Sequence, residues 1–221
     1  MEESKKSPYK ILPETQDGPV GHYYADISWE GDYSNWNLVR VFTPPDGSCL
    51  FHAICNSFFL PYRNCILNGK KISRTKIISS FRKELSEKLA SKIPGESKTY
   101  YESLNNGNTK NFSKDIPEFE LNAMQKELAS NHSLGYGYIE FIANIINKDI
   151  YILDGNRGDV YVSDELTVKG DRNSIVIYYL DGHYELVGIK NKDSFVVHFT
   201  PNHSFIKFLQ SRILETTNAE C

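Results

Sequence analysis

Cys49 stands where a thiol can act as a nucleophile. It follows the turn-forming residues Asp46, Gly47 and Ser48, and the apolar residues after it predict a helix that begins at or just before Cys49. A thiol at a helix N-terminus faces the positive end of the helix dipole, which lowers its pKa and favours the thiolate. We therefore predict a nucleophilic thiolate. The alternative of a small buried apolar residue stays open, because most free cysteines are of that kind.

The turn before Cys49 also offers hydrogen-bond donors. Backbone N–H groups at the start of a helix have no partner within the helix. We expect those of Gly47, Ser48 and Cys49 to hold the oxyanion of a tetrahedral intermediate. Gly47 has no Cβ, which lets a substrate carbonyl come close to the backbone. The segment therefore fits nucleophilic attack on a carbonyl.

His183 is the histidine whose setting best fits a general base. An apolar strand precedes Asp181-Gly182, a two-residue turn typical of hairpins, and His183 begins the next strand. Because strand side chains alternate, His183 and Glu185 point to the same face, where a carboxylate can orient an imidazole. A half-exposed strand histidine without a catalytic role fits the local sequence equally well.

Other chemistries lack their motifs. Cys49, His52 and Cys55 have the residue types of a zinc site, but Cys55 lies about 120° around the helix from Cys49. No later Cys/His pair supplies the missing ligands. The sequence has no GxSxG turn for a serine nucleophile, and neither the GxxxxGK nor the GxGxxG loop that binds phosphates and dinucleotides. We expect no cofactor and no metal.

Helices in the first two thirds of the chain and strands after them would position these residues. The expected helices cover residues 49–55, 73–93, 117–129, 139–146 and 204–213, and Ser73 caps the second of them. The expected strands cover residues 39–42, 150–153, 160–162, 175–179, 184–189 and 195–199. Helices followed by a mostly antiparallel sheet are typical of an α+β domain. Residues 105–113 are rich in Asn and Gly and predict a loop.

Length and composition narrow the class of protein. The chain has 221 residues, 40% of them hydrophobic and 24% charged, which predicts a folded core rather than a disordered or collagen-like chain. Its net charge of −3 does not favour a nucleic-acid partner. No apolar run approaches the roughly 18 residues that span a bilayer, and the four cysteines form no disulfide framework. We expect a cytoplasmic protein, in the host cytosol if the chain comes from a virus or an intracellular bacterium.

Three motifs, in order along the chain, resemble those of the ovarian-tumour (OTU) cysteine peptidases. Residues 46–54, Asp-Gly-Ser-Cys-Leu-Phe-His-Ala-Ile, are similar to the DGxCLF motif of that family. Residues 137–143, Gly-Tyr-Ile-Glu-Phe-Ile-Ala, resemble the helix that follows in the family. Residues 177–185, which end in His-Tyr-Glu, resemble its histidine hairpin. The likeness covers residues 39–190, and residues 1–36 and the C-terminal tail lie outside it.

The resemblance implies a papain-like OTU fold and a deubiquitinating cysteine protease. Such an enzyme cleaves the (iso)peptide bond after the C-terminal glycine of ubiquitin or a ubiquitin-like modifier, so the implied partner is ubiquitin or a polyubiquitin chain. By position, Cys49 would be the nucleophile and His183 the general base and acid. Asp46 would organise the turn, and Glu185, one methylene longer than the family's usual Asp, would orient His183. The alternative is an OTU-like module that binds ubiquitin without turnover.

The likeness also suggests how the chain is divided. We expect an N-terminal extension over residues 1–36, the catalytic domain over residues 37–192, and a C-terminal strand, short helix and tail over residues 193–221. The extension is expected to be partly flexible and to contain an aromatic segment from His22 to Trp36. We expect these aromatic residues to pack on the core, and an added strand or a surface for a partner is the alternative.

Overall fold

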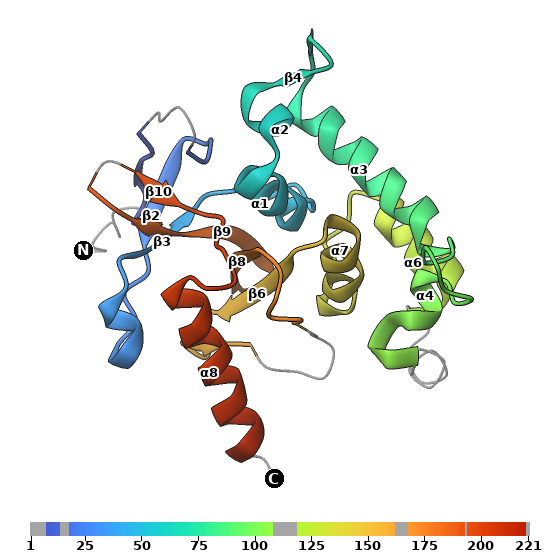
Figure 1. The fold of residues 1–221 in the computed structure, drawn as a ribbon. Coiled ribbons are helices and arrows are strands. Elements are labelled where there is room, and N and C mark those ends of the chain that lie inside the picture. The colour runs from blue at the N-terminus through green and yellow to red at the C-terminus, as the bar shows by residue number, and fades with distance from the viewer. Residues whose placement is uncertain (1–7, 14–17, 108–118, 162–167, 193, 220–221) are drawn as a thin grey trace, which may run out of the picture.

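A single sheet with helices on both faces organises the chain (Figure 1). The computed structural model describes residues 8–13, 18–107, 119–161, 168–192 and 194–219. The strands of the sheet are β1 (Lys10–Ile11), β2 (Tyr23–Asp26), β3 (Leu38–Val41), β6 (Asp149–Asp154), β7 (Asp159–Val160), β8 (Ser174–Leu180), β9 (His183–Lys190) and β10 (Phe195–Val196). They lie in the order β1-β2-β3-β9-β8-β6-β7, and β10 pairs with β9. Only β6 and β8 run parallel among the described pairs, so the predicted α+β class with a mostly antiparallel sheet is confirmed.

The helices form a layer on each face of the sheet. They are α1 (Cys49–Phe58), α2 (Leu60–Asn64), α3 (Arg74–Leu89), α4 (Tyr100–Ser103), α6 (Leu121–Ala129), α7 (Ile139–Ile146) and α8 (Ser204–Ala219). Figure 1 shows α8 on one side of the sheet and α1 and α7 on the other, with α3, α4 and α6 beyond α7. A separate hairpin joins β4 (Ile66–Leu67) to β5 (Lys70–Lys71). None of the described helices is long and apolar enough to cross a membrane.

The central strands are apolar on both faces because each face is covered. In β6, Ile150 and Ile152 belong to the core beneath α1 and α7, whereas Tyr151 and Leu153 belong to the core beneath α8. The same alternation continues in β8 and β9. A strand buried on both faces has no polar face, which is why these segments read as continuous apolar runs.

Local signals set most element starts, and tertiary packing shifts several ends. Ser73 caps α3 by accepting from the N–H of Lys76, as predicted, but the helix ends at Leu89 instead of continuing to residue 93. Helix α8 extends to Ala219, six residues past its predicted end. The predicted strand 195–199 is reduced to β10, and α6 begins at residue 121. Most of the predicted loop 105–113 lies outside the described residues.

The aromatic segment before β3 packs on the molecule and also adds a strand. Strand β2 pairs with β3, so this part of the predicted extension belongs to the same sheet. The ring of Tyr33 lies 4.9 Å from that of Phe208 in α8, and the ring of Trp36 lies 5.1 Å from that of Phe205. The expected packing of these aromatic residues on the core is therefore confirmed.

Candidate active site

Helix α1 brings Cys49 to the first residues of β9. Cys49 is the first residue of α1 and is buried, and α1 packs directly against β9. The backbone N–H of Tyr184 lies against the thiol and lowers its pKa. That N–H belongs to the peptide joining His183 to Tyr184, so the sulfur of Cys49 lies at the beginning of the strand that carries His183.

The pKa of the Cys49 thiol lies above its ordinary value, contrary to the prediction. Burial raises it, and this effect outweighs the backbone N–H groups of Tyr184 and Leu50, which lower it. The negative charge of Asp46 raises it further. The helix N-terminus acts in the predicted direction, but a buried thiolate loses more solvation than these donors return. The resting group is a neutral thiol.

Asp46 holds the turn that carries Cys49. Its Oδ1 accepts from the backbone N–H of Ser48 at 3.0 Å, and its Oδ2 lies 3.0 Å from Nε2 of His52. The other ring nitrogen of His52 lies 2.7 Å from the hydroxyl of Tyr62. The N–H of Ser48 is therefore already used and cannot hold an oxyanion, which corrects the prediction. From the sequence, His52 was considered only as a zinc ligand. Its position three residues after Cys49 is the one sequence feature that could have placed it near this turn.

Two backbone donors remain beside the thiol. Within the described part of the chain, the N–H groups of Gly47 and Cys49 donate to no protein oxygen. Gly47 has φ +76°, and a Cβ built on it would lie 1.9 Å from the carbonyl oxygen of Asn131. The space that a Cβ on Gly47 would need is thus occupied by the backbone of another segment of the protein. Glycine is required there for the left-handed turn and for this close approach, whereas the prediction had invoked access for a substrate.

The hairpin that presents His183 forms as predicted. Leu180 pairs with His183, and the two residues between them have φ values of +50° for Asp181 and +83° for Gly182. Positive φ at both positions is the signature of a tight hairpin turn. Burial lowers the pKa of His183 below its ordinary value, although the charges of Glu185 and Asp46 act to raise it. The imidazole is therefore neutral near pH 7 and can accept a proton.

Thr43 lies next to the imidazole of His183, and the sequence analysis did not predict this. Its hydroxyl oxygen is 3.5 Å from Nε2 of His183, and the same hydroxyl donates to the carbonyl oxygen of Tyr184. A hydrogen bond with the Thr43 backbone also raises the pKa of His183. Thr43 is buried two residues after the end of β3, so it is fixed relative to the ring. No sequence pattern distinguishes this threonine.

Glu185 lies two residues after His183 and on the same face of β9, but its carboxylate is engaged elsewhere. Oε1 accepts from the hydroxyl of Tyr9 at 2.8 Å, and Oε2 accepts from Arg40 at 2.7 Å. The Arg40 guanidinium stands 5.0 Å from the Tyr9 ring and 5.2 Å from the Tyr178 ring. Among the described residues we find no hydrogen bond from His183 to Glu185. Its orienting effect on His183 is limited to its charge, which corrects the direct contact expected from strand alternation.

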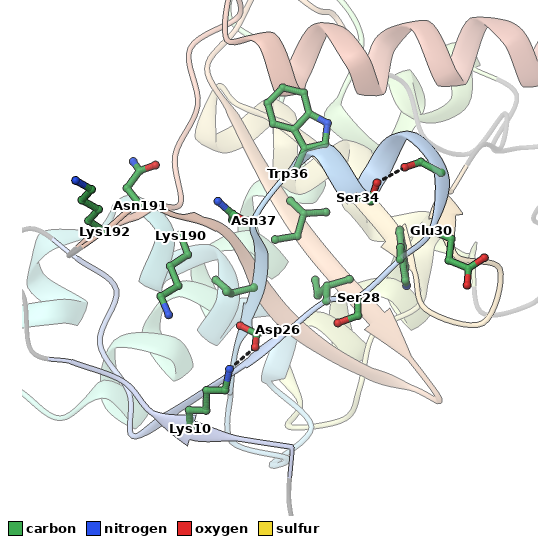
Figure 2. Close-up of a pocket in the computed structure, with 15 residues that line it drawn as sticks. Lys10, Asp26, Ser28, Glu30, Ser34, Trp36, Asn37, Lys190, Asn191 and Lys192 are labelled. Carbon is green, nitrogen blue, oxygen red and sulfur yellow. Dashed lines mark hydrogen bonds and ion pairs between the residues drawn. The ribbon is translucent and has the colours of Figure 1, made fainter.

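Two hollows elsewhere among the described residues do not include Cys49 or His183. One, of about 1310 Å³, lies beside β2 and β3 and is lined by Lys10, Asp26, Trp36 and Lys190 among others (Figure 2). Lys10 is paired with Asp26 within it. A smaller apolar cavity of about 330 Å³ lies between α1, α3 and α7 and includes Cys55. Within the described residues, no group of three or more His, Cys, Asp or Glu side chains is arranged to hold a metal ion.

Comparisons with known proteins identify similar folds. No protein-family model and no curated protein sequence matches the chain. Among solved structures, an OTU domain in complex with ubiquitin is 19% identical, with a TM-score of 0.49, over 85% of this chain and 88% of the other. The OTUD1 OTU domain is 18% identical, with a TM-score of 0.42, over 68% and 85%. The viral OTU domain protease from Taggert virus is 14% identical, with a TM-score of 0.39, over 84% and 96%. Cellular and viral OTU domains thus match over most of the chain at low sequence identity.

Proposed function

We propose that this protein is a deubiquitinating cysteine protease in which Cys49 is the nucleophile and His183 the general base and acid. The observation that carries the proposal is the position of the Cys49 thiol against the peptide between His183 and Tyr184. Cys49 at the start of α1 and the peptide after His183 at the start of β9 come from distant parts of the chain and lie together. Among the described residues, the N–H groups of Gly47 and Cys49 are unpaired at this place. A thiol, a neighbouring imidazole and free N–H donors are what acyl transfer to a cysteine needs, and this supports the proposal.

The first half of the reaction begins from a neutral pair. Thr43 stands at Nε2 of His183, so Nδ1 is the nitrogen that takes the proton of Cys49. The sulfur then attacks the carbonyl carbon of the substrate's terminal glycine. The N–H groups of Gly47 and Cys49 donate to the oxyanion that forms. Protonated His183 gives its proton to the leaving lysine amine, and a thioester on Cys49 remains.

The second half removes the acyl group. His183, now neutral, takes a proton from a water molecule, and the resulting hydroxide attacks the thioester carbonyl. The same two N–H groups hold the second oxyanion, and the thiol of Cys49 is released with the proton from His183. Thr43 acts as a positioning residue in both halves, because its hydroxyl lies at Nε2 of the imidazole and is itself fixed by its hydrogen bond to the carbonyl oxygen of Tyr184.

The substrate class rests on the sequence motifs around Cys49 and His183. They support ubiquitin, a polyubiquitin chain or a ubiquitin-like modifier as the partner. A second candidate is an OTU-like module that binds ubiquitin without cleaving it. The raised pKa of Cys49 and the engagement of Glu185 with Tyr9 and Arg40 favour that alternative, since both reduce the readiness of the dyad to react.

The test uses ubiquitin that carries a thiol-reactive group at its C-terminus. We expect a covalent adduct with the reduced wild-type chain and none with Cys49→Ala. Cys65→Ser is the matched control, because Cys65 is a free and more exposed cysteine outside the site, and this variant is expected to react fully. Cleavage of di-ubiquitin should follow the same pattern among the three proteins.

Each outcome separates the candidates. An adduct that disappears only in Cys49→Ala, together with cleavage, supports the protease. Measurable ubiquitin binding by folded wild-type protein without adduct or cleavage contradicts the protease and supports the binding module. An adduct that persists in Cys49→Ala shows that another cysteine reacts and removes Cys49 from the mechanism. A folded protein that neither binds nor reacts rules out ubiquitin as the partner.

A further inference from the structure

Arg82 is a fully buried arginine in the middle of α3. Its guanidinium stands 4.6 Å from the ring centre of Phe51 in α1. A group this costly to bury is retained where its donors find partners, and the guanidinium of Arg82 donates five hydrogen bonds.

The guanidinium links the turn before Cys49 to the end of α6 and to the segment that follows α6. Nη1 donates to the carbonyl oxygen of Gly47 at 3.2 Å and to the hydroxyl of Ser48 at 3.1 Å. Nη2 donates to the carbonyl oxygens of Glu127 at 3.0 Å and His132 at 2.9 Å, and Nε donates to that of Leu128 at 2.9 Å. Two of these partners, Glu127 and Leu128, belong to the last turn of α6, and the carbonyl of Glu127 also accepts from the backbone N–H of Ser130 at 3.1 Å.

The peptide between Gly47 and Ser48 is consequently held from both ends. Its carbonyl accepts from Arg82, and its N–H donates to Asp46. The N–H groups of Gly47 and Cys49, the two candidate oxyanion donors, flank this fixed peptide. The close approach of Gly47 to Asn131 adds a third restraint on the same turn. The turn has little freedom as long as Arg82 is present.

The charge of Arg82 has no direct counter-ion. All five hydrogen bonds go to neutral oxygens, and no carboxylate among the described residues forms an ion pair with it. Arginine stays protonated even when buried. Nη1 donates to the hydroxyl of Ser48, the residue directly before Cys49, so the positive charge lies beside the turn that carries the thiol.

We propose that Arg82 is a positioning residue of this site: it fixes the turn that carries Cys49, and its unpaired charge favours the Cys49 thiolate over the thiol. The inference rests on the proposed function only in taking Cys49 as the reactive group. It extends that function because it explains how a thiolate at Cys49 in α1 is stabilised by Arg82 in α3. A residue with a purely structural role would leave the acidity of the thiol unchanged.

Alkylation of Cys49 by iodoacetamide tests this without ubiquitin. The rate is measured between pH 6 and 10 on the full chain, with the modified cysteine identified by peptide mass spectrometry. For Arg82→Met, we expect the midpoint of the pH–rate curve to move upward and the rate at pH 7 to fall about threefold or more, as for the loss of one nearby charge in a buried site. Ser86→Ala is the matched control, because it removes only the hydrogen bond from Ser86 to the carbonyl of Gln125 between α3 and α6, one turn from Arg82.

The result overturns the proposal if the midpoint for folded Arg82→Met equals that of wild type, or if Ser86→Ala moves it equally. Should Arg82→Met not fold, Ser48→Ala removes one acceptor of Nη1 and leaves the guanidinium buried. We then expect slower alkylation of Cys49 at pH 7, by about twofold, and an unchanged rate contradicts the proposal. Because ubiquitin is absent from the assay, a failure of the proposed protease activity is seen separately, in the adduct experiment.

Discussion

Replacing Glu185 distinguishes a role of this residue in the stability of the fold from a role in turnover. The motif resemblance makes Glu185 the orienting acid of His183, which predicts a large loss of turnover on substitution. The structure instead pairs its carboxylate with Arg40 and Tyr9. We therefore expect Glu185→Ala to lower the free energy of unfolding, while the folded variant retains most of its turnover.

The magnitude follows from the burial of the pair. The side chain of Glu185 is 1% exposed and that of Arg40 is 18% exposed. Removing one partner of a fully buried ion pair costs about 3–5 kcal/mol, and because Arg40 retains some contact with water we expect roughly 2–3 kcal/mol. At about 2–4 °C per kcal/mol for a chain of this size, that lowers Tm by roughly 4–12 °C.

The assay measures Tm and kcat on the same preparations of three variants. Glu185→Gln keeps one acceptor oxygen for Arg40 or Tyr9 and the volume of the side chain, and is expected to lose less stability than Glu185→Ala. The kcat of both, per folded molecule, is expected to stay within about tenfold of wild type, whereas His183→Ala should lose about 10³-fold or more. A fall in kcat of Glu185→Gln comparable to that of His183→Ala, at unchanged Tm, refutes this reasoning and restores Glu185 as the orienting acid.

Three further predictions concern the turn and the histidines. Gly47→Ala should abolish turnover and lower Tm, because the new Cβ meets the backbone oxygen of Asn131. Gly182→Ala, also at positive φ but in open space, should lower the free energy of unfolding by only about 1 kcal/mol. Equal losses in the two variants would contradict the role of the contact between Gly47 and Asn131. Burial lowers the pKa of His183, and activity is lost as pH falls through that pKa. The midpoint of the acid limb of the kcat/KM profile should therefore lie below pH 6.5. A midpoint above 6.5 would exclude His183 as the titrating base. Burial lowers the pKa of His198 to about 4, so the unfolded state binds more protons between pH 6.5 and 4 and stability falls as pH decreases. Thermal unfolding of His198→Leu should depend less steeply on pH in this window, and an unchanged slope would refute this account.

Features of the site that depend on neighbours in sequence were predictable. The start of α1 at Cys49, the cap at Ser73 and the Asp181-Gly182 hairpin each arise from signals within a few residues. Their physical cause is local: turn residues adopt positive φ, and a hydroxyl satisfies the first N–H groups of a helix. The alternation in β9 also placed His183 and Glu185 on one face.

Features that depend on distant segments were not predictable. Arg82 lies on a helix whose lysines face solvent, and only the approach of α6 and of the turn at Gly47 makes its burial favourable. Tyr9 reaches Glu185 because β1 and β2 extend the sheet beyond β3. Periodicity reports which face of an element is apolar, but it does not report which partner a buried polar group will meet. The partners of Glu185 and Arg82 are therefore visible only in the fold.

The pKa values of Cys49 and His183, the two groups proposed to react, show why these distant contacts matter for the chemistry. Burial raises the pKa of Cys49 and lowers that of His183, so both shifts oppose a resting thiolate–imidazolium pair. Charge must then separate during the reaction, and the groups that stabilise it must already be in place, because a buried site has little water to reorient. The fixed turn between Asp46 and Cys49 and the charge of Arg82 meet that requirement. On this reasoning the reactivity of Cys49 depends less on the helix N-terminus at which it lies than on the side chains that hold the turn before it.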